Sequence, residues 1–248
     1  MKENNPFDNF KPCGQNTIMK HIERLRKVVN LAIKNEWLDK DPFMKFKPLF
    51  QKKEREFITA SELSIIESRE FEISRLEQVK DMFIFSCYTG LAYIDLMKLT
   101  PHDIIKGFDG KLWISTTRKK TNVPVKVPLL NKPLELIEKY KNHPVACHYG
   151  TLFPPISNQR MNLYLKELAD VCRITKPLTF HIARHTFATT VTLTNGVPIE
   201  TVSKLLGHTS IRTTQIYAKV IEQKVGTDID KLREKLESNT IPVKRNVG

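Results

Sequence analysis

Residues 181–185 read His-Ile-Ala-Arg-His, residues 205–208 read Leu-Leu-Gly-His, and residues 213–217 read Thr-Thr-Gln-Ile-Tyr. The arginine offers a planar fork of donors that matches two oxygens of a phosphate. Histidine exchanges protons near neutral pH, and a tyrosine hydroxyl can act as a nucleophile. The stretch from His181 to Tyr217 therefore favours chemistry on a nucleic-acid backbone.

The bulk composition agrees with a polyanionic partner without choosing one. The 248 residues include 40 Lys and Arg against 27 Asp and Glu, a formal net charge of +13. Such an excess favours nucleic acid, because each phosphate that it neutralises releases condensed counterions. Ribosomal proteins, nucleases and proteins that bind anionic membranes share this composition, so charge alone does not identify the function.

Neither a membrane segment nor a disulfide framework is expected. No apolar run approaches the roughly 20 residues that span a bilayer, and residues 1–6 lack the apolar core of a signal peptide. The four cysteines are scattered without paired spacing, as in a cytoplasmic protein with reduced thiols. They are Cys13, Cys87, Cys147 and Cys172.

The N-terminal part of the chain predicts one helix and a linker. An apolar stripe with helical spacing runs through residues 17–37. One helix with an irregular start does not make a self-sufficient domain, so we expect residues 1–48 to be the C-terminal part of a helical module whose beginning is absent. Residues 49–57 read as a charged linker. Thr59 and Glu62 then have the spacing of a capping box, which marks the start of a second domain.

The second domain is predicted to be mainly helical with a small antiparallel hairpin, an α+β fold. Helices are expected over 60–68, 75–88, 93–99, 132–142, 158–172, 180–193, from Pro198 to Leu206, from about Ser210 through Tyr217, and over 227–237. Two strands, 112–115 and 123–127, flank a basic turn. Pro124 lacks a backbone N–H, which predicts that the second strand lies at an edge of the sheet.

Each candidate residue, taken singly, also has an ordinary interpretation. His181, Arg184 and His185 would share one face of a helix, and three polar residues there can simply face solvent. A histidine such as His208 is common at a helix end, and a tyrosine such as Tyr217 is more often part of a core. His181 and His185 have the spacing of a zinc-binding helix, but Ile182 stands where a zinc protease has glutamate. We expect no metal and no cofactor.

Together, however, these motifs closely resemble the tyrosine recombinase family, the phage-integrase-like enzymes that cut and rejoin DNA. Thr89-Gly90-Leu91 resembles the family's first active-site box, and 116–129 resembles its hairpin with a mobile catalytic lysine. Residues 16–42 look like the end of its DNA-gripping core-binding domain. The resemblance implies a catalytic domain over 58–222. It also implies a C-terminal helix and tail, 223–248, that docks on a neighbouring protomer or packs on its own domain.

The resemblance also implies a role for each site residue. Tyr217 would attack the scissile phosphate and form a 3′-phosphotyrosine, and Arg184 would clamp the non-bridging oxygens. His181 would assist proton transfer at the tyrosine, and His208 would hydrogen-bond the phosphate. Lys120, with Lys119 as its competitor, would protonate the leaving 5′-oxygen. The covalent intermediate keeps the bond energy, so neither ATP nor a metal is implied.

The first box departs from the family pattern at one position. Ala92 stands where the family has an arginine, while Asp95 occupies the place of an acidic supporting residue. Loss of one charged donor at a phosphate costs a few kcal/mol of transition-state binding. We therefore hypothesise that Arg118 swings in from the basic turn to replace the missing guanidinium. The alternative is that residues 118–120 are an exposed turn that merely touches phosphates.

The expected function is that of a site-specific recombinase. The sequence of residues 89–96 looks most like that of integrases of Bacteroides-type mobile elements. The implied partners are double-stranded DNA, other protomers in a DNA-bound tetramer, and accessory DNA-bending or directionality proteins. The implied location is the cytoplasm of a bacterium, in association with the nucleoid. A type IB topoisomerase shares this tyrosine chemistry, and a DNA-binding protein of the same fold without catalysis is the alternative that Ala92 favours.

Overall fold

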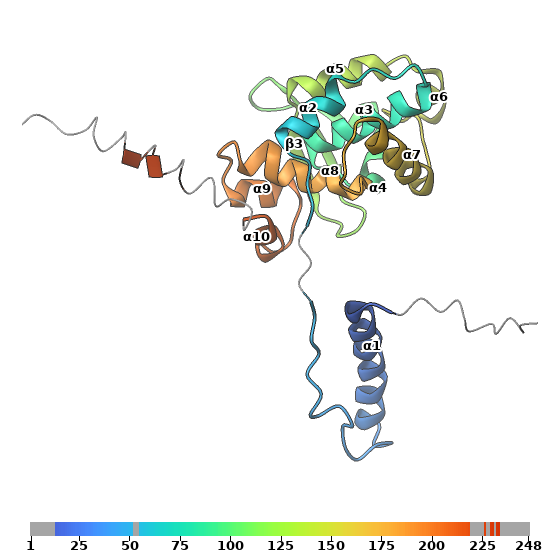
Figure 1. The fold of residues 1–248 in the computed structure, drawn as a ribbon, viewed down its shortest axis with the longest axis vertical. Coiled ribbons are helices and arrows are strands. Elements are labelled where there is room, and N and C mark those ends of the chain that lie inside the picture. Colours follow the sequence, from blue (N-terminus) through green and yellow to red (C-terminus); the bar gives the residue numbers. More distant parts are fainter. Residues whose placement is uncertain (1–12, 52–54, 219–225, 227–228, 231, 234–248) are drawn as a thin grey trace, which may run out of the picture. The chain divides into compact units, whose positions relative to one another are not determined.

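The chain divides into two compact units, Met1–Glu54 and Arg55–Gly248. The computed structural model describes residues 13–51, 55–218, 226, 229–230 and 232–233 (Figure 1). These residues are mostly helical and include a small three-stranded antiparallel sheet, which confirms the predicted fold class. None of the described helices is long and apolar enough to cross a bilayer.

The first unit is built on one long helix, α1 (Gln15–Lys34). It begins two residues earlier and ends three residues earlier than predicted. The segment after α1 is bonded back to its start, because the Asn16 side chain donates to the carbonyl of Gln51 and accepts from its N–H, at 2.9 and 2.8 Å. Met19 is the buried residue of the helix, whereas Leu25, Val28 and Leu31 are exposed.

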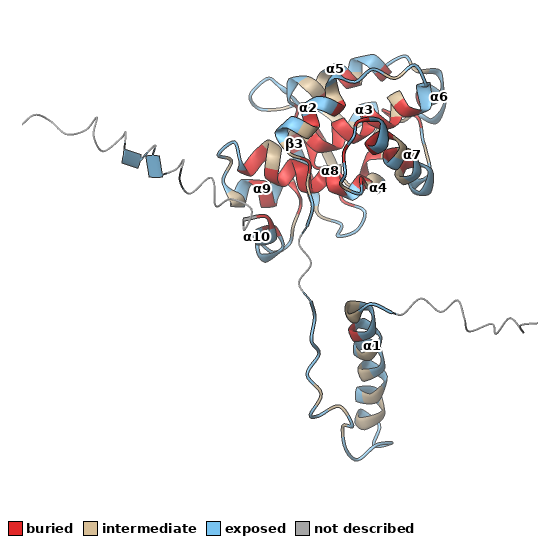
Figure 2. Ribbon diagram, in the orientation of Figure 1, coloured by how far each residue is buried: buried red, intermediate tan, exposed pale blue. Residues whose placement is uncertain are grey.

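The second unit is organised around α3 (Ser74–Thr89), which is buried along most of its length (Figure 2). Its apolar residues, among them Phe83 and Phe85, contact neighbours on every side. Its neighbours include α2 (Ala60–Ser68), α5 (Asn131–Tyr140), α7 (Asn158–Val171) and α8 (Phe180–Thr186). The helix predicted over 93–99 is shorter, since α4 covers only Tyr93–Leu96.

The sheet has the strand order β1-β2-β3 and is antiparallel throughout. Its strands are β1 (Ile104–Lys106), β2 (Leu112–Thr117) and β3 (Pro124–Pro128). Pro124 lies on an edge strand, as its missing N–H predicts. The three-residue β1 follows the short helix η1 (Pro101–Asp103) and was not predicted, because three residues are too few to show an alternating pattern.

The C-terminal part of the described chain contains four further helical segments: α6 (Pro144–Tyr149), η2 (Phe187–Leu193), α9 (Ile199–Leu205) and α10 (Arg212–Ala218). The segment predicted as one helix over 180–193 is α8 continued by η2, a wider π-helical turn. Within it Thr192 Oγ1 donates to the carbonyls of Phe187 and Ala188, both at 2.8 Å. Most of the helix predicted over 227–237, with Leu236, lies outside the described residues.

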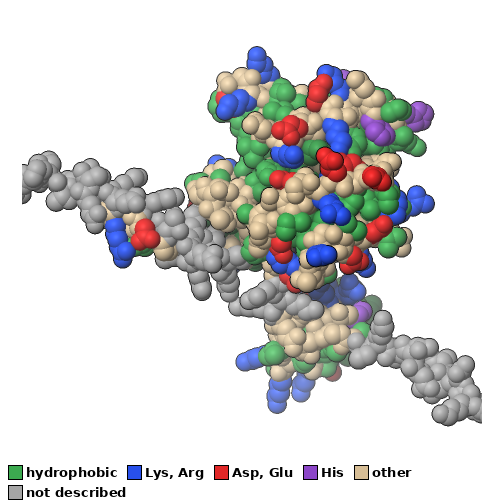
Figure 3. Space-filling view, turned by 45° about the horizontal axis from the view of Figure 1, so that its top comes forward, with side chains coloured by type: hydrophobic (Ala, Val, Ile, Leu, Met, Phe, Trp, Pro, Cys, Tyr) green, Lys and Arg blue, Asp and Glu red, His purple; other side chains and the backbone are tan. Residues whose placement is uncertain are grey.

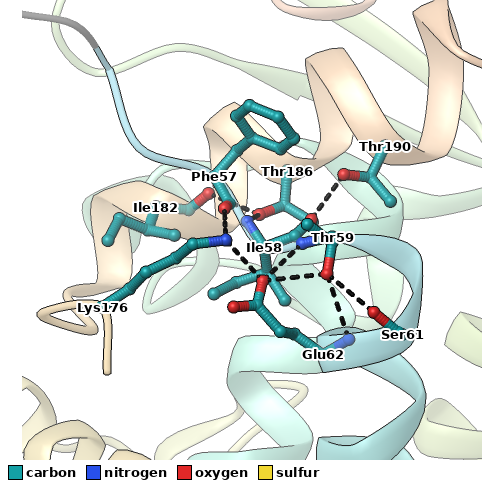
Figure 4. Close-up of polar contacts among 9 residues, drawn as sticks. All are labelled: Phe57, Ile58, Thr59, Ser61, Glu62, Lys176, Ile182, Thr186 and Thr190. Carbon is teal, nitrogen blue, oxygen red and sulfur yellow. Dashed lines mark hydrogen bonds and ion pairs between the residues drawn. The ribbon is translucent and has the colours of Figure 1, made fainter. Parts of the chain in front are cut away.

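The chain enters the second unit through a polar anchor (Figure 4). The predicted capping box is present: the Thr59 N–H donates to Glu62 Oε2 at 2.8 Å, and the Glu62 N–H donates to Thr59 Oγ1. Lys176 also reaches the Glu62 carboxylate. The Ile58 N–H donates to Thr186 Oγ1 at 2.9 Å. The bond from Ile58 to Thr186 fixes the incoming chain to α8, which carries residues 181–185.

We expect Thr59→Ala to lower the free energy of unfolding by about 1 kcal/mol, the usual effect of losing an N-cap side chain. Thr59→Ser keeps the hydroxyl and should lower it by much less. Urea denaturation followed by circular dichroism measures both values. Equal stability of the alanine and serine variants would contradict a capping role for this hydroxyl.

Candidate functional site

Arg184 lies at the centre of the candidate site and is buried on α8. Its guanidinium donates to two backbone carbonyls, those of Gly90 and Leu206. Gly90 ends α3 with φ of 70°, and a Cβ there would lie 2.5 Å from the Phe187 ring. Glycine is required at this position because it permits both the left-handed cap and the close approach of η2.

Arg118 is folded into the same place from the turn between β2 and β3. Its Nη1 donates at 2.9 Å to the carbonyl of Leu206, which also accepts from Arg184. Gly207 makes room for it, since a Cβ on Gly207 would lie 2.6 Å from Arg118 Cδ. The two guanidiniums therefore share one acceptor and are neighbours, which is the placement that the hypothesis of a replacement arginine requires.

Asp95 supplies negative charge beside Arg118 and is itself buried on α4. Its Oδ2 lies 3.6 Å from Arg118 Nε, and its Oδ1 accepts from the Lys119 N–H at 2.9 Å. The carboxylate thereby holds the start of the basic turn. Ala92 is the N-terminal cap residue of α4, is half-buried, and contributes no charge.

The two lysines of the turn are exposed, and neither is packed into the cluster. They differ in which neighbouring groups have a pKa that their charge changes. Lys120 is among the cations that lower the pKa of His181. Lys119 instead acts on Lys98, whose pKa is lowered by desolvation and by the neighbouring Lys119 ammonium.

His208 follows the left-handed turn at Gly207, where φ is 60°. Its Nδ1 lies 2.8 Å from the hydroxyl of Thr214, a fully buried residue on α10. Thr214 thereby fixes the orientation of the imidazole. The hydroxyl of Thr214 was not recognised as a site group in the sequence.

Tyr217 is buried on α10, and its hydroxyl lies 2.8 Å from Nδ1 of His185. His181 is exposed, and its ring stands edge-on to that of His185 with centroids 4.4 Å apart. The prediction that His181, Arg184 and His185 share one face is therefore only partly right. The rings of His181 and His185 contact each other edge-on one turn apart, while Arg184 points to the carbonyls of Gly90 and Leu206.

Burial and an excess of positive charge both lower the pKa values of the site's histidines. Burial, and then the charges of Arg184 and Arg118, lower the pKa of His208 to about 4. Burial, with His181, Arg55 and Arg184, lowers the pKa of His185 to about 4. Burial and Arg118 bring the pKa of Arg184 down to about 10. A bound anion would relieve this imbalance.

Arg55 is a contributor that the sequence analysis missed, because it was assigned to a solvated linker. Its charge acts on His181, His185 and Tyr217. No motif signals it, since its position depends on how the incoming chain is anchored to α8.

On the face of the molecule drawn in Figure 3, Lys and Arg side chains are interspersed with Asp and Glu.

The zinc alternative gains no geometric support from the described part of the chain. There, no three His, Cys, Asp or Glu side chains come together in a way that could hold a metal ion. His185 is committed to Tyr217, and His148 lies on α6 outside the cluster. All four cysteines have free thiols, with Cys87 and Cys172 buried and Cys13 and Cys147 exposed.

Comparison with protein-family models gives two matches. Residues 64–224 match the phage integrase family, and residues 2–48 match the phage integrase SAM-like domain. The first match covers well over half of the chain and includes every residue of the cluster from Asp95 to Tyr217.

Curated relatives include a tyrosine recombinase XerD of Halalkalibacterium halodurans, 34% identical over 146 residues, which cover 55% of this chain and 48% of the relative. A tyrosine recombinase XerC of Pediococcus pentosaceus is 26% identical over 230 residues, which cover 86% of this chain and 74% of the relative. The matched part of the chain thus spans about half of the XerD relative.

Among solved structures, the Tn1549 transposon integrase in complex with circular intermediate DNA aligns with a TM-score of 0.64 at 20% identity, over 82% of this chain and 75% of that one. A lambda integrase dimer bound to a COC′ core site aligns with a TM-score of 0.62 at 19% identity, over 78% and 69%. These likenesses show that the fold is shared.

The arrangement predicts that Arg118→Met will raise the pKa of His208, because a positive charge beside that imidazole is removed. The pKa of His185 should change much less, since Arg118 is not among the charges that act on it. An NMR-monitored pH titration of the histidine rings measures both values in one sample. An unchanged pKa of His208 would contradict the placement of Arg118 in the site.

Proposed function

The chain belongs to the phage integrase family, and from this premise we propose that it is a site-specific DNA recombinase that cuts and rejoins strands through a 3′-phosphotyrosine intermediate. One observation carries the proposal. A buried tyrosine hydroxyl, on α10, lies in the same cluster as two guanidiniums that converge on the Leu206 carbonyl. A nucleophile and a cationic anion-binding group are the two parts that attack at a phosphate requires.

In the proposed reaction, the Tyr217 oxygen bonds to phosphorus as the bond from phosphorus to the 5′-oxygen breaks. The 5′-hydroxyl of a partner strand later attacks the phosphotyrosine, so the phosphodiester is rebuilt and the tyrosine is released. Each cleavage is matched by one ligation. The bond energy is conserved, and the chemistry uses no ATP and no metal ion.

Arg184 and Arg118 would bind the non-bridging oxygens and stabilise the charge that develops on them. Their hydrogen bonds to backbone carbonyls support this role, because a guanidinium that is already oriented needs little reorganisation during the reaction. His208, held by Thr214, would donate to the same phosphate. Arg118 would thereby take the place of the arginine that is absent at Ala92, with Asp95 holding it in position.

Lys120 would give a proton to the leaving 5′-oxygen. Its position on the exposed turn leaves the ammonium group able to move, and the influence of its charge on His181 supports Lys120 over Lys119. His181, whose ring contacts that of His185, would assist proton transfer from the exposed side of the cluster.

We further propose that the protein acts on double-stranded DNA as part of a tetramer and integrates or excises a Bacteroides-type mobile element. The solved relatives include a transposon integrase and a lambda integrase dimer bound to DNA, which supports DNA and other protomers as partners. The SAM-like match over residues 2–48 supports a DNA-gripping role for the first unit, with 49–57 as the linker. Residues 223–248 would dock on a neighbouring protomer. Accessory DNA-bending or directionality proteins would assist the recombination, which would take place at the nucleoid.

The unmutated chain should form a covalent adduct with nicked DNA that carries the ends of its element, because the nick traps the phosphotyrosine. Tyr217→Phe should bind the same DNA and form no adduct. Denaturing gel electrophoresis detects the adduct, and a mobility-shift assay measures binding. Strong binding without any adduct from the unmutated chain would favour a DNA-binding protein, and relaxation of supercoiled DNA without strand exchange would favour a topoisomerase.

Arg118→Ala should slow adduct formation by roughly 10²-fold, the usual effect of removing one charged donor from a transition state. Arg69→Ala removes an exposed arginine outside the cluster and serves as the matched control. Single-turnover cleavage rates measure the effect, with a thermal melt to show that both variants are folded. Equal rates for Arg118→Ala and the control would refute the replacement of the missing arginine.

A further inference from the structure

The hydrogen bond between His185 and Tyr217 has no role in the reaction proposed so far. His185 Nδ1 lies 2.8 Å from the phenolic oxygen, and the two side chains are 5% and 4% exposed. The bond joins α8 to α10 across the cluster. A buried contact of this length places the phenolic proton directly between an acid and a base.

Both groups are in the protonation states that such a transfer requires. Burial raises the pKa of Tyr217, although the charges of Arg184, Arg55 and Arg118 lower it, so the phenol is protonated at neutral pH. A protonated phenol is a weak nucleophile and needs a base. Burial and the charges of His181, Arg55 and Arg184 keep His185 neutral. Its Nδ1 is then free to accept, provided that the remaining proton sits on Nε2.

We propose that His185 is the proton acceptor for Tyr217, with Nδ1 taking the phenolic proton as the tyrosine oxygen attacks phosphorus. This assignment rests on the proposed recombinase function. The O–H bond of the tyrosine breaks, its electron pair forms the bond to phosphorus, and the imidazole becomes an imidazolium. In ligation the same proton returns to the tyrosine oxygen as its bond to phosphorus breaks. The cycle is therefore balanced in protons.

His181 is placed to support this step rather than to perform it. In the described chain, the imidazole bonded to the Tyr217 hydroxyl belongs to His185, and the exposed His181 contacts His185 edge-on. The charges that face His185 are those of His181 and Arg184 on its own helix and of Arg55 on the incoming chain, while Tyr217 faces it from α10. The charges of Arg184 and Arg55 oppose the imidazolium, and that of His181 does so when His181 is protonated, so the negative charge of bound DNA would ease its formation.

The test uses His185→Asn, because the Asn carbonyl oxygen can accept the same hydrogen bond but cannot take up a proton at neutral pH. Single-turnover cleavage of nicked DNA should be slowed roughly 10²-fold or more. The rate of the variant should rise about tenfold per pH unit as the phenolate fraction increases, whereas the unmutated chain should be nearly independent of pH above its histidine pKa. His148→Asn, an exposed residue on α6, is the matched control.

A second substrate separates this role from that of the leaving-group acid. A 5′-bridging sulfur in place of the oxygen makes a thiolate leaving group, which departs without a proton. This substrate should restore cleavage by Lys120→Ala and should leave His185→Asn slow. If this substrate restored cleavage by both variants, the assignment of His185 as the proton acceptor for Tyr217 would be overturned.

Two other outcomes would also overturn it. Faster cleavage by His185→Asn would mean that the hydrogen bond restrains the tyrosine instead of activating it. A rate for the unmutated chain that rises tenfold per pH unit through neutrality would mean that Tyr217 reacts without an internal base, and this measurement needs no variant to fold. Absence of any adduct from the unmutated chain would instead refute the recombinase function itself.

Discussion

The site depends on one backbone carbonyl, that of Leu206, which accepts hydrogen bonds from both Arg118 and Arg184. Two guanidiniums repel each other, and burial weakens the solvation that would otherwise offset the repulsion. The carbonyl at the end of α9 holds them together, and Asp95 compensates part of the charge. This constraint determines why α9 must stop here, why a glycine follows at 207, and why the β2–β3 turn folds inward.

The remaining positive charge favours an anionic ligand and, together with burial, the neutral forms of the histidines. Burial is the first cause of the lowered pKa of both His185 and His208, and positive charge adds to it. The guanidiniums that act on His208 are Arg184 and Arg118, and those that act on His185 are Arg55 and Arg184. A phosphate entering the cluster would supply the negative charge that the cluster lacks. In the proposed reaction, binding would therefore make it easier for the same histidines to accept or share a proton, and would couple substrate binding to acid–base chemistry.

The sequence predicted the parts of this arrangement that are encoded locally. The capping box at Thr59, the helix over 60–68 and the edge position of Pro124 depend on neighbours within a few residues. The strand β1, the helix α6 and the π-helical turn η2 were missed because they are short or depend on hydroxyls that bond back to the helix. Arg118 could be hypothesised from a missing arginine. The contact of His185 with Tyr217 joins residues 32 apart, and only the packing of α10 creates it.

Helix α8 explains why this contact escaped the sequence pattern. Successive residues on a helix point about 100° apart, so Arg184 and His185 leave the helix in different directions. Arg184 turns toward Gly90 and Leu206, and His185 turns toward Tyr217. A helix with functional side chains on two adjacent faces must be packed against other elements on both faces. Helix α8 is accordingly buried from Ile182 through Thr186. Contacts from α3, α7, η2 and α10 cover α8. In the proposed reaction this helix would present an anion-binding group on one side and a base for the nucleophile on the other.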